Sequence, residues 1–326
     1  MIKETPPAIL ALLLTASLSL SACQTGEKPA AVSTQPPAAS ITVTADINTG
    51  IRTKHITVIP NDVAPWLSQI ILLDTSGDLY RTALDSGKAK PLNAKAKDAI
   101  GLMRRKAPGV LLTLSDGGTL SAFIESNDEG DLSPLAVSSP NSTLSGFCHG
   151  EKAPDGTVYA ITNDSHLVSL AVLVEDNQHI HLSETQSVKL NSQPLGCLGF
   201  KNEPLLRYED KLSSPSNNNQ GFPMNLDGTQ QLALVSVEDS TTVLKPLGNN
   251  PNLGVFLTSK DEPFSISVQG GLSTEGLSQM NAAYMYVDSL GGVFRDGALI
   301  LSDANSDRLV MISKPLVQRE LASNLP

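Results

Sequence analysis

Short apolar runs separated by polar turns fill the chain from about Ile56 to its C-terminal end. The runs are rich in Leu, Val, Ile and Thr, and clusters of Gly, Asp, Asn, Ser and Pro stand between them. Strands favour β-branched and aliphatic residues, whereas the residue types of the clusters favour turns. We find no helical period sustained over ten or more residues. The pattern therefore predicts an all-β fold.

A small repeat narrows this prediction. Gly77, Gly118 and Gly156 each follow a polar turn and open a β-like run, and they recur roughly forty residues apart, which is typical of one four-stranded propeller blade. The body of the chain is long enough for about six such blades. A later copy at Gly297, followed by the run at residues 308–312, predicts the hairpin of a last blade. The alternative is a β-sandwich, although sandwiches rarely need this length in one domain.

The N-terminal residues show a different pattern. Lys3 precedes an apolar run over residues 8–20, and two small residues separate this run from Cys23. About thirteen apolar residues are too few to cross a bilayer, which needs roughly twenty. The arrangement resembles the lipobox of bacterial lipoprotein signal peptides, which are cut before the cysteine. This resemblance implies that residues 1–22 are removed and that Cys23 becomes the lipidated N-terminus.

The residues after Cys23 predict a tether and then a single domain. Residues 23–40 consist mainly of Ala, Pro, Thr, Ser and Gln, so they bury too little surface to offset the entropy of ordering. We therefore expect a disordered linker there and a propeller over residues 41–326. Gln24 in place of aspartate resembles an outer-membrane sorting signal, which implies a lipoprotein of the outer membrane that faces the periplasm or the cell surface.

Charge and cysteine content limit the partners. The net charge of −10 disfavours nucleic acid and anionic lipid surfaces, because both require clustered Lys and Arg. Arg104, Arg105 and Lys106 form a basic cluster, and we take the two arginines as candidate phosphate-binding residues.

Cys148 and Cys197 are the cysteines of the mature body, and an oxidising envelope permits them to pair. The alternative is two buried thiols too far apart to meet.

Four segments follow one another in an order typical of one family. They are Gly146-Phe147-Cys148 before residues 155–160 (DGTVYA), residues 191–197 (NSQPLGC), residues 288–299 (DSLGGVFRDGAL) before Ser302-Asp303, and residues 61–66 (NDVAPW). They resemble Gly-(Leu/Phe)-Cys with Asp-Gly-x-(Leu/Phe)-Tyr-Ala, Ser-Gln-x-Glu-Gly-Cys, Leu-Gly-x-x-Phe-x-x-Gly-Leu with Gln-Asp, and Asp-Asp-Pro-Ala-(Ile/Val)-Trp. These are motifs of the β-propeller phytases, secreted calcium-dependent enzymes that remove phosphate from inositol hexakisphosphate.

The resemblance implies a phosphoric monoester hydrolase of the 3-phytase type, in which calcium ions and a ring of Lys and Arg hold the phosphates. At the family positions, Tyr159 is a candidate substrate residue. The candidate calcium ligands are acidic side chains: Asp62, Glu209, Asp210, Glu238 and Asp303.

Several positions of the family's chemistry are replaced. Leu195 stands where the family has Glu, residues 74–77 (DTSG) replace Lys-Lys-Ser-Gly, and residues 163–165 (NDS) replace Thr-Gly-Lys. Loss of carboxylates and lysines weakens both calcium and phosphate binding. We therefore expect a phytase-like envelope lipoprotein of phosphate-ester metabolism with weak or lost activity and weak or partial calcium binding. The alternative is a non-catalytic propeller that holds another protein or an inositol phosphate, or that serves as an assembly module of the outer membrane.

One further metal-binding pattern lies outside these motifs. His179 and His181 alternate along a predicted strand, so their imidazoles share one face. Two imidazoles on one face can bind a metal ion, but the sequence near them offers no evident third or fourth ligand.

Overall fold

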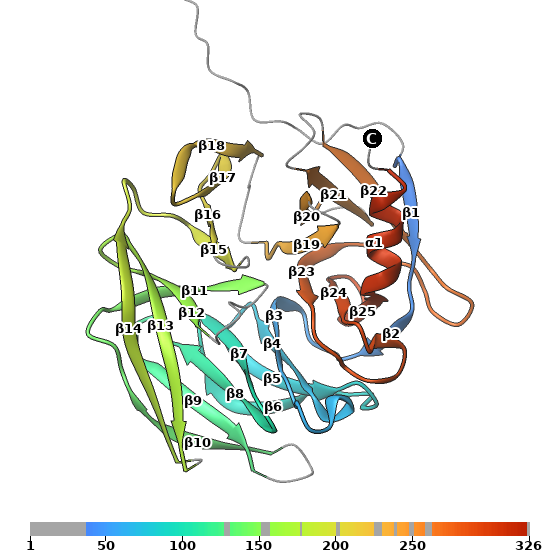
Figure 1. Ribbon diagram of the computed structural model, residues 1–326. Coiled ribbons are helices and arrows are strands. Elements are labelled where there is room, and N and C mark those ends of the chain that lie inside the picture. Colours follow the sequence, from blue (N-terminus) through green and yellow to red (C-terminus); the bar gives the residue numbers. More distant parts are fainter. Residues whose placement is uncertain are drawn as a thin grey trace, which may run out of the picture.

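The computed structural model is a ring of β-sheets around a central axis (Figure 1). It describes residues 37–126, 131–150, 157–176, 178–199, 203–224, 230–237, 240–247, 251–257 and 263–324. Within these ranges, consecutive antiparallel strands form six blades, each with its first strand nearest the axis. This arrangement is a β-propeller, so the predicted all-β class and about six blades are confirmed.

Blades 1 to 3 come from the first half of the chain. Their strands are β3 (Thr53–Ile59), β4 (Gln69–Asp74), β5 (Asp78–Ala83) and β6 (Lys90–Lys95); β7 (Asp98–Arg104), β8 (Ala107–Leu114), β9 (Leu120–Glu125) and β10 (Leu132–Ser138); and β11 (Leu144–Gly150), β12 (Val158–Thr162), β13 (His166–Glu175) and β14 (His179–Lys189). Short 3₁₀ turns, η1 (Pro65–Leu67) and η2 (Gly292–Phe294), lie in the connections β3–β4 and β23–β24.

Blades 4 to 6 come from the second half. Their strands are β15 (Gly196–Gly199), β16 (Leu205–Arg207), β17 (Lys211–Ser214) and β18 (Asn217–Pro223); β19 (Ala233–Val237), β20 (Ser240–Pro246), β21 (Asn252–Leu257) and β22 (Phe264–Gln269); and β23 (Met280–Tyr286), β24 (Ala298–Asp303) and β25 (Arg308–Ser313). Strands β24 and β25 pair antiparallel with Asp303 opposite Arg308, which confirms the predicted hairpin of the last blade.

The ring is closed by the N-terminal strands. Strand β2 (Ala45–Asn48) pairs antiparallel with β25 and becomes the fourth strand of blade 6. Strand β1 (Ala39–Thr42) pairs parallel with β22 at the outer edge of blade 5. The strand therefore includes Ala39 and Ser40, which the sequence analysis assigns to the linker. Their weakly apolar sequence gives no local strand signal, and the backbone of β22 provides the pairing.

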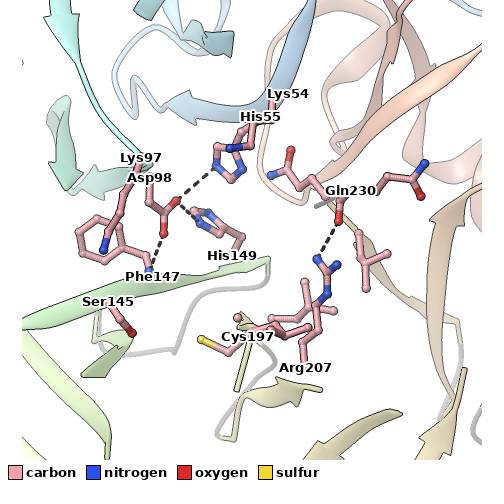
Figure 2. A pocket seen from close by; sticks show the side chains of 16 residues that line it. Lys54, His55, Lys97, Asp98, Ser145, Phe147, His149, Cys197, Arg207 and Gln230 are labelled. Atoms are coloured by element: carbon pink, nitrogen blue, oxygen red, sulfur yellow. Dashed lines mark hydrogen bonds and ion pairs between the residues drawn. The ribbon is translucent and has the colours of Figure 1, made fainter. Parts of the chain in front are cut away.

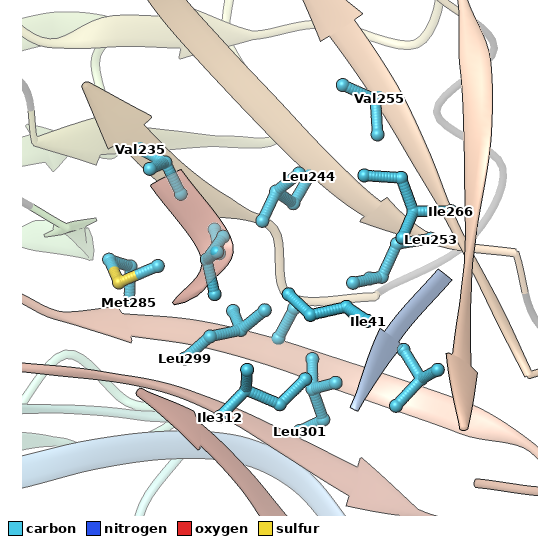
Figure 3. Packing of buried hydrophobic residues seen from close by; sticks show 14 of the residues in the cluster. Ile41, Val235, Leu244, Leu253, Val255, Ile266, Met285, Leu299, Leu301 and Ile312 are labelled. Atoms are coloured by element: carbon cyan, nitrogen blue, oxygen red, sulfur yellow. The ribbon is translucent and has the colours of Figure 1, made fainter. Parts of the chain in front are cut away.

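Apolar side chains fill the interfaces between blades. Between blades 5 and 6, Leu244, Val255 and Ile266 face Leu299 and Ile312 in one buried cluster (Figure 3). This packing removes aliphatic surface from water, and it is the main stabilising contribution in a protein with 4% aromatic residues.

A C-terminal helix, α1 (Lys314–Ala322), covers the same cluster with Val317 and Leu321. The sequence shows no helical period over ten or more residues, and α1 is consistent with this because it has nine residues, of which only two are buried. In the described ranges, no helix has the length and apolar character needed to cross a bilayer.

The glycine repeat marks turns, and its copies are at equivalent positions in blades 1 and 2 but not in blade 6. Gly77 and Gly118 precede the third strands β5 and β9, whereas Gly297 precedes the second strand β24. The copy at Gly156 lies outside the described residues. Gly77 and Gly118 have φ of 83° and 79°, a conformation that favours glycine in tight turns. The blade count was therefore predictable from spacing, because Gly77 and Gly118 are one blade apart, although the copy at Gly297 is not at the equivalent position of its blade.

Glycine also permits the closest contact between inner strands. A Cβ atom on Gly101 of β7 would lie 1.7 Å from the carbonyl oxygen of Val58 in β3. At the same point, the Gly101 N–H donates a hydrogen bond to Thr57 Oγ1 at 3.0 Å. Blades 1 and 2 thus approach each other backbone to backbone at the ring's centre.

Candidate functional site

A cavity of about 220 Å³ opens at the end of the ring where the inner strands begin (Figure 2). Its wall comes from the inner strands β3, β7, β11 and β15, from Arg207 at the end of β16 and from the segment before β19. Three cationic side chains, Lys54, Lys97 and Arg207, contribute to the lining. Among the described residues that line it, Asp98 is the only carboxylate. The cavity is therefore cationic in a chain whose net charge is −10.

Asp98 binds groups from both neighbouring inner strands. Its Oδ1 lies 2.7 Å from Nε2 of His149 in β11 and 3.8 Å from Nε2 of His55 in β3. Its Oδ2 accepts a hydrogen bond of 2.7 Å from the backbone N–H of Phe147. Figure 2 shows both imidazoles directed at this carboxylate. His55, Asp98 and His149, which we call the inner triad, thus connect blades 1, 2 and 3 on the wall of the cavity.

The environment sets the charge of two triad members. Burial, together with the nearby His149, lowers the pKa of His55 to about 3, so its imidazole is neutral at neutral pH. Burial alone would raise the pKa of Asp98, but the hydrogen bond and charge of His149 outweigh it and hold that pKa below its usual range. The carboxylate is therefore ionised. His149 is 8% exposed, and its Nδ1 has no hydrogen-bond partner among the described groups.

A disulfide fixes the strand that holds His149. Cys148 and Cys197 stand opposite each other in the parallel pair β11–β15, and the structure joins them by a disulfide with 4.5 Å between their Cα atoms. Cys148 packs in an apolar cluster with Leu206, while the next residue, His149, reaches Asp98. This alternation is what a strand imposes on successive side chains.

Gln231 ties three inner strands together beside the cavity. Its amide donates a hydrogen bond to the carbonyl oxygen of Ile56 and accepts one from the N–H of Ile56, both at 2.8 Å. Its backbone oxygen accepts a hydrogen bond from the N–H of Ala283 in β23 at 3.0 Å. Next to it, Arg207 Nη1 donates to the carbonyl oxygen of Gln230 at 2.9 Å. These bonds hold the segment before β19 at the cavity wall.

Three candidate calcium ligands lie at the same end of the ring but outside the cavity lining. Asp303 is buried and binds Ser278 Oγ at 2.8 Å and Arg308 Nη2 at 3.3 Å, so both of its oxygens have protein partners. Hydrogen bonds from Ser278 lower the pKa of Asp303 despite burial, which would raise it. Glu209 and Asp210 are exposed in the turn between β16 and β17.

The remaining candidates are distributed elsewhere. Asp62 follows β3 at the opposite end of the ring, where its Oδ2 accepts a hydrogen bond from the Lys106 N–H at 2.7 Å. Arg104 and Arg105, which end and follow β7, are also at that end. Tyr159 packs against the apolar cluster around the disulfide. Glu238 and Cys23 lie outside the described residues.

The structure therefore assembles different residues from those that the sequence indicated. Among the described residues, one group of three or more His, Cys, Asp and Glu side chains has its ligand atoms within 4.8 Å of one another. This group is the inner triad. The histidines at 179 and 181 are stacked with ring centroids 6.4 Å apart, and His181 lies 3.3 Å from Glu175 on the exposed face of β14. A signal for the triad exists in the sequence, because its members are polar residues in apolar inner strands about one blade repeat apart.

Comparison with known proteins assigns this chain to no family. No protein-family model matches the chain, and no curated protein matches it. Similar solved structures include crystal structures of BBS1N in complex with ARL6DN, soaked with lead or with mercury. The lead-soaked structure shows 12% identity and a TM-score of 0.44 over 85% of this chain and 97% of that chain. The mercury-soaked structure shows 12% identity and a TM-score of 0.43 over 84% and 96%.

Proposed function

We propose that this chain is a non-catalytic binding module whose cavity takes an anionic group of its ligand. The observation behind the proposal is the charge of the lining, where three cations face one carboxylate in an otherwise acidic protein. Because protein walls screen charge less than water does, these cations attract an anion more strongly than the same groups on an open surface. Arg207 adds a planar guanidinium, which suits phosphate and carboxylate oxygens.

The size of the cavity favours a single anionic group. Its volume of about 220 Å³ is below the range of roughly 300–1,000 Å³ for pockets that enclose drug-sized ligands. A phosphate group or an acidic side chain fits this space better than a whole inositol hexakisphosphate does. The ligand is therefore either an inositol phosphate that inserts one phosphate or a partner protein that inserts an acidic side chain, and both present the same oxyanion chemistry.

Two further observations support binding without catalysis. None of the candidate calcium ligands in the described ranges lines the cavity. Leu195, which stands where the phytase motif has Glu, lines its mouth and is 59% exposed. An apolar group at this position offers no ligand to calcium and no proton for hydrolysis.

Inorganic phosphate is expected to bind the purified full-length protein and to raise its thermal midpoint by mass action. Replacing both cavity lysines, as Lys54→Gln with Lys97→Gln, should weaken phosphate affinity about tenfold, because each lost charge removes roughly 1 kcal/mol or less of attraction. Calorimetric titration measures this change. The matched control is Lys90→Gln, because Lys90 is an exposed lysine of blade 1 outside the cavity. Equal phosphate affinity in the double variant and the wild type would contradict the proposal.

Competition and activity assays on the same purified protein distinguish the two kinds of ligand from each other and from catalysis. Myo-inositol phosphates that compete with inorganic phosphate would identify a small-molecule ligand, whereas competition by an Asp- and Glu-rich peptide alone would identify a protein partner. Steady phosphate release from phytate with excess calcium would contradict the non-catalytic proposal. It would support the phytase-type hydrolase that the sequence motifs imply.

We also propose that the chain is anchored by lipid at Cys23, on the evidence of the lipobox-like residues before it. In cells labelled with a radioactive fatty acid, the Cys23→Ser variant is expected to lose the label and to leave the membrane fraction. The control is Ser21→Ala, which keeps a small residue before the cysteine. Retention of label in the Cys23→Ser variant would disprove the assignment.

A further inference from the structure

We infer that the inner triad, His55, Asp98 and His149, binds a divalent transition-metal ion of the Zn²⁺ type at the wall of the cavity. The inference has a second part, which rests on the proposed function: the bound metal leaves a coordination position open toward the cavity, and the anionic group of the ligand occupies it. Two imidazoles and a carboxylate are the ligand types that catalytic and exchangeable zinc sites use with one open position.

The distances within the triad suit a metal. Zinc bonds of about 2.0–2.1 Å in a tetrahedral arrangement place ligand atoms roughly 3.3 Å apart. Asp98 Oδ1 lies 2.7 Å from His149 Nε2 and 3.8 Å from His55 Nε2, so the observed separations bracket that value. Movements of about half an ångström would complete the geometry, and rotation of side chains supplies this much. The metal bond would also replace the contact of His55 Nε2 with the Ala99 carbonyl oxygen, which is 3.2 Å long.

The three ligands stand on a rigid support. Each is on an inner strand of a different blade, and inner strands have neighbours on both sides. The Phe147 N–H holds Asp98 Oδ2, so that Oδ1 faces the histidines. The neighbouring disulfide fixes the segment of β11 that contains His149. Outer contacts of this kind orient metal ligands and raise metal affinity.

His149 has unused binding capacity. Its Nε2 contacts Asp98, while Nδ1 is buried and has no hydrogen-bond partner among the described residues. Without an ion, such a buried and unpartnered nitrogen destabilises the fold. Rotation of His149 toward a metal breaks its hydrogen bond with Asp98 and shifts its edge-on packing against His55, whose ring centroid lies 4.2 Å away. The carboxylate then exchanges a hydrogen bond for a stronger metal bond.

The donor set also selects among metals. Calcium prefers six to eight oxygen ligands, whereas imidazole nitrogens suit zinc, copper, nickel and iron. Coordination of such a metal by two imidazole nitrogens and one carboxylate oxygen matches the ligand atoms that the triad brings together. This site is therefore distinct in residues and in chemistry from the calcium site that the sequence motifs imply.

The lysines around the triad give the metal and the anion a reason to bind together. Lys54 and Lys97 repel a bare metal cation. The carboxylate of Asp98 neutralises only one of the two positive charges of this cation. An anion that binds both the metal and the lysines offsets this repulsion. Metal and anion are thus expected to increase each other's affinity by the same factor, as linkage requires.

The metal site is tested on the full-length protein after removal of metals with a chelator. Zn²⁺ titration is expected to show one tight site per chain, and Co²⁺ should give the visible absorption of a tetrahedral complex. His55→Ala and His149→Ala should each weaken Zn²⁺ binding at least a hundredfold. The control is His181→Ala, which alters the exposed histidine pair and should leave the tight site unchanged.

Two readouts keep this test decisive. Metal-free melting curves show whether the triad variants fold, and the Co²⁺ spectrum of the wild type reports the ligand geometry even if a variant does not fold. Failure of the wild type to bind Zn²⁺ above the level of a denatured sample would overturn the inference. So would tight binding that persists in both triad variants or disappears in His181→Ala.

The second part is tested by phosphate titration with and without Zn²⁺. Phosphate affinity is expected to be about tenfold higher in the zinc-loaded protein. If zinc binds but phosphate affinity is unchanged, the metal site stands and its coupling to the anion is wrong. If phosphate binds the metal-free protein and zinc does not bind at all, the proposed function stands and the inference fails.

Discussion

Gly101→Ala is expected to destabilise the propeller by about 3 kcal/mol or more, because it adds an atom where two backbones are in contact. The new Cβ would lie 1.7 Å from the Val58 carbonyl oxygen and 2.4 Å from its carbonyl carbon. A flexible side chain would move aside, but backbone within an inner strand moves only with its blade. Separating β3 from β7 also breaks the hydrogen bond from Gly101 N–H to Thr57 Oγ1.

Urea unfolding of the purified protein measures this change. The matched control is Gly196→Ala, because Gly196 also lies on an inner strand and its added Cβ would meet nothing within 4 Å. The control should change the free energy of unfolding by less than about 1 kcal/mol. Similar midpoints for Gly101→Ala and the wild type would show that blades 1 and 2 do not approach as closely as described.

Gln231→Leu is expected to cost about 2–4 kcal/mol of unfolding free energy. The substitution keeps the approximate volume of the side chain but removes both hydrogen bonds to Ile56. It leaves a buried N–H and a buried carbonyl without partners, at about 1–3 kcal/mol each. Because Gln231 links the segment before β19 to β3 across blade 6, the loss weakens the connection between blades 5, 6 and 1.

The control for this variant is Gln269→Leu, which changes the same residue type at an exposed position at the end of β22. It should alter the free energy of unfolding by no more than about 0.5 kcal/mol. If both leucine variants unfold at the same urea concentration, the hydrogen bonds of Gln231 do not contribute to stability.

The fold was predictable because its determinants are local. Strand-length apolar runs and polar turns define a β-protein, and the spacing of Gly77 and Gly118 gives the size of a blade. Helix α1 was not predictable, since Val317 and Leu321 alone give no period. The start of β1 at Ala39 was missed for a different reason: its strand conformation depends on pairing with β22, which is more than two hundred residues away.

The site was largely unpredictable because its determinants are not local. His55, Asp98 and His149 belong to no motif, and their only sequence signal is their spacing as polar residues of apolar inner strands. The packing of blades 1, 2 and 3 around the axis brings the first residues of β3 and β7 close to His149, near the end of β11. By contrast, the described acidic residues aligned with the phytase motifs lie at three separate places: Asp62 after β3, Glu209 with Asp210 in the β16–β17 turn, and Asp303 in blade 6. Asp303 is buried and stabilises blade 6 through Arg308.

The pairing of β1 and β2 with the last blades delays closure of the ring during synthesis of the protein. These strands are synthesised near the start of the chain, yet their partners β22 and β25 are synthesised near its end. The ring cannot close until almost the whole polypeptide has been made. Until then β1 and β2 have no partner strands, and unpaired strand edges are prone to aggregation. A protein of this design therefore depends on chaperones or on rapid completion of the chain to protect its first strands.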